Sequence, residues 1–134
     1  MSEPPEFSVR LVADVARQVL TVTGEVDLAN AKTLKRFVDR VIEGTDGDIT
    51  LDLADVGYMD STGLDVLLSA REALSAAGRE LELLDPSRPV LVLLEVCGLT
   101  ERISIVRSSP TGDNLPGNSP RDEDEQDRMV GTNR

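Results

Sequence analysis

The chain has 134 residues, with 25 acidic and 14 basic side chains, a formal net charge of −11, one cysteine and no histidine. This length fits one domain with a modest core, and the negative charge argues against nucleic acid or anionic membranes as direct partners. A single cysteine excludes an intrachain disulfide and a multi-cysteine metal site. Without histidine the chain lacks the usual general base near neutral pH and the commonest metal ligand. The composition therefore indicates a domain poorly equipped for catalysis.

The N-terminal part of the chain predicts two strands after a short lead-in. Residues 1–6 contain two prolines and two glutamates and are expected to be flexible. Apolar and polar residues alternate over 7–11, as in a half-buried strand near a sheet edge, and residues 19–22 form a second strand that Gly24 ends. No run approaches the ~18 apolar residues of a membrane span, and no basic, apolar leader is present. We therefore expect a cytoplasmic protein without membrane insertion.

Helical spacing begins after Asp27, which suits the N-cap of the first helix. Gly44 supplies the stop of this helix. Plain capping is the favoured role of Asp27 when the local chemistry is considered by itself. The apolar residues that recur at helical spacing, and are expected to form the buried face, are Leu28, Ala31, Leu34, Val38, Val41 and Ile42.

Residues 49–53 predict a central buried strand, and Asp52 and Asp55 bracket its exit into a turn. Side-chain oxygens of aspartate commonly accept hydrogen bonds from nearby backbone N–H groups in such turns. Several carboxylates in one region could also hold a divalent metal ion. Turn and cap duties account for each of them, so the metal site is the less favoured interpretation.

The next helix is predicted to start at Ser61, with Asp60 as its N-cap and Gly78 as its stop. A phosphate on Ser61 would lie near the positive end of the helix dipole and the free N–H groups of the first turn. The local chemistry is equally that of an ordinary helix start, which is the commoner role. The predicted core face holds Gly63, Val66, Leu67, Ala70, Leu74 and Ala77.

The opposite face of this helix carries an unusual stripe of Ser61, Asp65, Leu68 and Glu72. A leucine between acids on a solvent face suits a surface that docks a partner. We therefore predict that Leu68 contributes to partner binding and not to the core. The alternative, that it is one of the exposed leucines common on protein surfaces, carries equal weight.

The remaining elements complete an α/β pattern. Residues 80–84 predict a strand and residues 103–106 a last short one; between them Pro89 opens a helix whose core face should hold Val90, Leu93, Leu94 and Cys97. Helices between the later strands imply a single-domain, largely parallel or mixed sheet with helices packed on it. Residues 108–134, which include four consecutive acidic residues at 122–125, are expected to form a disordered acidic tail.

Three motifs resemble those of the STAS domain, in particular that of the bacterial anti-sigma factor antagonists. They are YMDSTGL at residues 58–64, GEVD at 24–27 followed by Ala31 and Leu34, and CGLT at 97–100. They occur in the family's order with similar spacing, and the resemblance covers residues 7–107. Asp65 departs from the pattern, because many relatives have glycine or another small residue there. That difference could alter which partner binds.

The resemblance implies a STAS fold and a binding switch without a cofactor and without enzyme activity. The unphosphorylated protein would bind an anti-sigma factor with serine kinase activity, and phosphorylation of Ser61 would release it, with a serine phosphatase as a further partner. The resemblance also places Asp27 in the region that faces the kinase. The full set of predicted partner-binding residues is Asp27, Asp60, Thr62, Asp65, Leu68 and Glu72, and the last three of these come from the exposed stripe of the helix. The alternatives are a STAS scaffold or accessory subunit of another signalling or transport complex and, less favoured, a nucleotide-handling domain. No glycine-rich phosphate loop supports the last of these.

Overall fold

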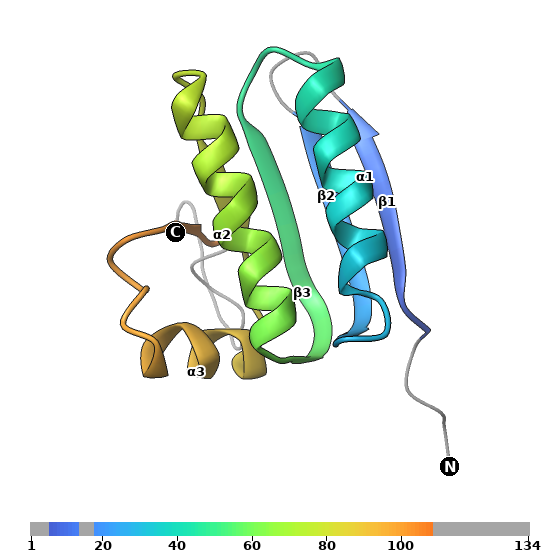
Figure 1. Ribbon diagram of the computed structural model, residues 1–134. Helices are drawn as coiled ribbons and strands as arrows, with labels where there is room; N and C mark the ends of the chain where they lie inside the picture. The colour runs from blue at the N-terminus through green and yellow to red at the C-terminus, as the bar shows by residue number, and fades with distance from the viewer. Residues whose placement is uncertain (1–5, 14–17, 109–134) are drawn as a thin grey trace, which may run out of the picture.

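The structure is a computed structural model that describes residues 6–13 and 18–108. Strands and helices alternate after an initial pair of strands, as predicted (Figure 1). The predictions for the lead-in and for the acidic tail fall almost entirely outside the described residues. The elements are β1 (Ser8–Ala13), β2 (Gln18–Val26), α1 (Ala31–Gly44), β3 (Ile49–Met59), α2 (Ser61–Ala76), β4 (Leu81–Leu84), α3 (Arg88–Val96) and β5 (Ser104–Val106).

The described strands form one sheet in the order β1-β2-β3-β4-β5. β1 runs antiparallel to β2, whereas β2, β3, β4 and β5 pair in parallel. The predicted α/β class and mixed sheet are therefore confirmed. β3 lies in the middle of the sheet, so the chain that leaves it enters α2 at the centre of one sheet end.

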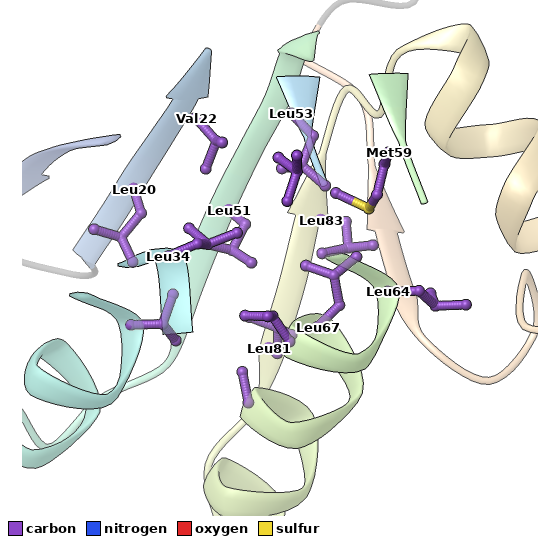
Figure 2. Packing of buried hydrophobic residues seen from close by; sticks show 14 of the residues in the cluster. Leu20, Val22, Leu34, Leu51, Leu53, Met59, Leu64, Leu67, Leu81 and Leu83 are labelled. Atoms are coloured by element: carbon purple, nitrogen blue, oxygen red, sulfur yellow. The ribbon is translucent and has the colours of Figure 1, made fainter. Parts of the chain in front are cut away.

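The core lies between the sheet and the helices α1 and α2, which run side by side over one face (Figure 1). Leu20, Leu51 and Leu83 occupy one row across three neighbouring strands and are fully buried. Leu34 from α1 and Leu67 from α2 pack on this layer and are equally inaccessible (Figure 2). α3 lies near the start of α2 and adds Val90 and Leu94 to the same cluster.

Two strands are longer than predicted. β2 continues through Gly24, which has a φ of +98° and lies where the register with β3 shifts. A side chain there would come within 2.8 Å of the Phe7 backbone, so glycine permits this close approach of chains rather than ending the strand. β3 continues to Met59, so Asp52 and Asp55 lie within the strand and not in a turn after it. Asp52 still accepts a local hydrogen bond from the Ala54 N–H at 3.1 Å.

The helix faces were predicted well apart from Leu68 in the middle of α2 and some residues near the helix ends. Leu28 was expected in the core but is 74% exposed, because α1 begins only at Ala31. Ala77 and Cys97 are exposed because α2 and α3 end one residue before them. Leu64, which was not assigned to the core face, is 6% exposed and belongs to the core cluster (Figure 2).

Candidate functional site

Two loops meet at one end of the sheet and carry Asp27 and Asp60, while the other predicted site residues lie on α2, which starts directly after the second loop. β2 and β3 are paired in parallel up to Val26 and Met59, so the residues that follow leave the sheet side by side. The Asp60 N–H donates to the Val26 carbonyl at 3.2 Å and ties the two loops together. This pairing brings Asp27 and Asp60 to the same edge of the molecule, although they are distant in the sequence.

Asp60 is the N-cap of α2, as predicted. Its carboxylate accepts hydrogen bonds from the Thr62 N–H at 2.9 Å and the Gly63 N–H at 3.3 Å. The Thr62 hydroxyl also donates to this carboxylate, and that bond is the main cause that lowers the pKa of Asp60 below its usual value. The cap is therefore ionised near neutral pH and holds the first turn of α2 in place.

Ser61 is the first residue of α2, and its side chain is exposed. Its hydroxyl forms no hydrogen bond with any other described residue, whereas the neighbouring Thr62 is half-buried and donates to Asp60. Of the two hydroxyls that could accept a phosphate, that of Ser61 is therefore the more exposed and the one that makes no hydrogen bond with a described residue. A phosphate on Ser61 would lie at the positive end of the α2 dipole, where anions are stabilised.

Gly63 fixes the start of α2 against the strand ends. A Cβ at this position would lie 2.7 Å from Met59 Cγ and 2.8 Å from Val26 Cγ1, and both of those side chains are buried. Only a residue without a side chain allows this approach, so the position of Ser61 relative to the sheet depends on Gly63.

Asp27 does not cap α1, contrary to the prediction. Its carboxylate accepts from the Ala29 N–H at 3.0 Å, while its own N–H donates to the Asn30 side-chain oxygen at 3.0 Å. The Asn30 amide group also donates to the Glu25 carbonyl at 2.7 Å. These local bonds form a turn that delays the helix until Ala31 and leaves Asp27 half-buried at the site.

The predicted stripe on α2 is only partly exposed. Asp65, one turn from Ser61, and Glu72, further along the helix, are exposed, but Leu68 is half-buried and packs against the core cluster. Leu64 is buried as well, and it widens the buried arc of the helix toward Leu68. The prediction that Leu68 stays outside the core is therefore wrong in part.

A groove of about 280 Å³ runs between α1 and the first half of α2, next to Ser61. Sequence reasoning missed this groove, because it assigned Leu28 to the core and gave Lys32 no role. The position of Leu28 directly after the GEVD motif was the one available signal. The groove is lined by Leu28, Ala31, Lys32, Lys35, Thr62, Asp65, Val66 and Ser69.

Over 6–13 and 18–108, no group of three or more histidine, cysteine, aspartate or glutamate side chains could hold a metal ion. No helix in that part of the chain is long and apolar enough to cross a membrane.

Comparison with known proteins agrees with this geometry. The STAS domain family matches residues 9–112. The anti-sigma-B factor antagonist of Bacillus subtilis is 32% identical over 94 residues, which cover 69% of this chain and 84% of that protein.

Two solved structures share the fold. An anti-sigma factor antagonist from Mycobacterium paratuberculosis has a TM-score of 0.71 and 21% identity, over 83% of this chain and 92% of that one. The Bacillus cell fate determinant SpoIIAA in its phosphorylated form has a TM-score of 0.61 and 20% identity, over 78% and 93%. The family match and the identity to the Bacillus subtilis protein carry the assignment, and the chain belongs to the STAS domain family.

Proposed function

We propose that this protein is an anti-sigma factor antagonist of the cytoplasm that is switched by phosphorylation of Ser61. In the unphosphorylated state it binds an anti-sigma factor that is also a serine kinase, and it thereby frees a sigma factor. The kinase transfers a phosphate from ATP to the Ser61 hydroxyl, and the modified protein is released. A serine phosphatase that acts on phospho-Ser61 resets the switch.

The observation that carries this proposal is the state of the Ser61 hydroxyl. It is exposed at the first position of α2 and makes no hydrogen bond within the described residues. The rival acceptor, Thr62, is half-buried and already donates its hydroxyl to Asp60. A kinase therefore meets a free hydroxyl at Ser61 and would have to break the cap to reach the one next to it.

The same location explains why phosphorylation would act on binding rather than on folding. A phosphate adds about −1.5 to −2 charges at pH 7, which the start of α2 can accommodate through its dipole and free N–H groups. In a complex, that charge would have to lose water beside the exposed Asp65 carboxylate. An uncompensated buried charge costs several factors of ten in affinity, so a loss of about a hundredfold is expected.

Binding by three variants tests the proposal. Ser61→Ala should capture the anti-sigma kinase from lysate and remain bound in the presence of ATP, whereas Ser61→Glu should bind poorly while remaining folded. Ser75→Glu, which adds the same charge to an exposed position of α2, is the matched control and should bind as the wild type does. Equal binding by Ser61→Glu and the unmodified wild type in the absence of ATP would refute the switch.

A further inference from the structure

We propose that the groove between α1 and α2 receives an apolar side chain of the anti-sigma partner, and that Lys32 pairs with a carboxylate beside that side chain. This inference rests on the proposed function and adds to it the chemistry of the partner's docking segment. Leu28 and Lys32, which do not belong to the exposed stripe of α2, would then determine which partner binds.

The groove has the size and lining for a side chain. Its inner wall includes Ala31 and Val66, which are buried core residues, and Leu28 lies at its edge with 74% of its surface exposed. A volume of about 280 Å³ is just below the range of about 300–1,000 Å³ typical of pockets that hold small molecules. Exposed apolar surface rimmed by polar residues is a feature of protein-interaction sites.

The charges around the groove define what accompanies that side chain. Lys35 is engaged, because its ammonium group forms a salt bridge with Asp39 at 2.9 Å. The side chains of Lys32 and Asp65 form no hydrogen bond or ion pair with another described residue, nor with each other. Lys32 is therefore the lysine of the groove whose charge is available to a partner, in a protein whose net charge is −11.

These two charges also orient the docking segment. α1 contributes Lys32, whereas α2 contributes Asp65. A carboxylate of the partner is attracted to the α1 wall and repelled from the α2 wall, so the docking segment should turn its carboxylate toward α1. Ser61 precedes Thr62, which also lines the groove, so a phosphate on Ser61 brings negative charge toward the same carboxylate. Release after phosphorylation follows from this repulsion.

Affinity measurements on the full chain test this inference. The probe is the purified anti-sigma kinase that Ser61→Ala captures, and all variants carry Ser61→Ala so that phosphorylation cannot contribute. Leu28→Ala and Lys32→Glu should each weaken binding about tenfold or more, and Lys32→Arg should retain it. Matched controls are Val96→Ala, an exposed valine on α3, and Arg36→Glu, an exposed cation on α1 outside the groove. Both controls should stay within about twofold of the parent.

A charge exchange separates orientation from net charge. The double variant Lys32→Asp and Asp65→Lys keeps the net charge but reverses the two walls, and it should bind as weakly as Lys32→Glu does. Full affinity of the double variant would refute the proposed orientation of the partner's carboxylate toward α1. Equal losses of affinity for Lys32→Glu and Arg36→Glu would refute it as well, because they would show only a general effect of net charge. If the parent binds the kinase and Leu28→Ala binds equally well, the groove is not the docking site, although the proposed function stands. If the parent binds no such kinase, the proposed function itself fails.

Discussion

Gly63→Ala should destabilise the domain and displace Ser61, because the start of α2 has no room for a side chain. The added Cβ would lie 2.7 Å from Met59 Cγ and 2.8 Å from Val26 Cγ1, distances that real Cβ atoms do not adopt. Met59 is 4% exposed and Val26 is fully buried, so neither can move toward solvent without disturbing the core. Overpacking of this kind costs about 1–3 kcal/mol.

Helix propensity opposes part of this cost. Alanine is favoured over glycine within helices by about 1 kcal/mol, so the net destabilisation should be about 0–2 kcal/mol, which is about 1–3 kcal/mol worse than a helical glycine-to-alanine change without the close contact. For a domain of this size, each kcal/mol of destabilisation lowers Tm by about 4–8 °C. Thermal and denaturant unfolding would measure the change, and the rate of Ser61 phosphorylation should fall with it, because Ser61 lies two residues before Gly63.

Gly44→Ala is the matched control for this substitution. Gly44 is the last residue of α1, and a Cβ there would meet no atom within 4 Å. That variant should be as stable as the wild type or slightly more stable. If Gly63→Ala were as stable as Gly44→Ala, the close contact at the start of α2 would not constrain the site, and the argument would be refuted.

Three further predictions concern the N-cap residue Asp60, the α2 residue Leu68 and Arg79, which lies far from the site. Because hydrogen bonds lower the pKa of Asp60 in the folded state, its contribution to stability is present above the unfolded pKa and is lost as pH falls through the folded pKa. The Tm difference between wild type and Asp60→Ala should therefore shrink in acid, and a constant difference would contradict the cap's ionic character. Leu68→Ala should lower the unfolding free energy by about 1–2 kcal/mol, since Leu68 is half-buried against the core cluster. An unchanged unfolding free energy would show that Leu68 contributes nothing to the core. Arg79→Met should lower the unfolding free energy by about 1–3 kcal/mol, because the Arg79 guanidinium donates to the carbonyls of Ile42 and Gly47, both at 2.8 Å. The rate of Ser61 phosphorylation should not change, because Arg79 lies just beyond the opposite end of α2 from Ser61.

The cap and the serine were predictable because helix starts are encoded locally. Asp60, Ser61 and Thr62 are neighbours in the sequence, and the N-cap bonds of Asp60 join residues two and three positions apart. The order of strands and helices was predictable for a similar reason, since each buried face follows a short period. The motif resemblance, rather than the local chemistry, singled out Ser61 from ordinary helix starts.

Most errors arose where distant segments decide the local structure, and the error at Leu28 arose from a local turn that the helical spacing did not reveal. Val56 and Met59 are buried because β3 continues to pair with β2. The polar residues around them interrupt the apolar pattern, so the sequence predicted the end of the strand too early. Leu28 has the spacing of the α1 core face, but the turn formed by Asp27 and Asn30 starts the helix later. The groove depends on how α1 and α2 lie side by side, which no periodicity within either helix contains.

Mapping the phosphate tests the switch most directly. The wild-type chain is incubated with the captured kinase and ATP, and the modified residue is identified by mass spectrometry. In parallel, the affinity of the phosphorylated chain for the same kinase is compared with that of the unmodified chain. We predict phosphate on Ser61 and a loss of affinity of about a hundredfold, with the fold retained. Phosphate on Thr62 in place of Ser61, or undiminished binding by the chain phosphorylated on Ser61, would contradict the proposed switch.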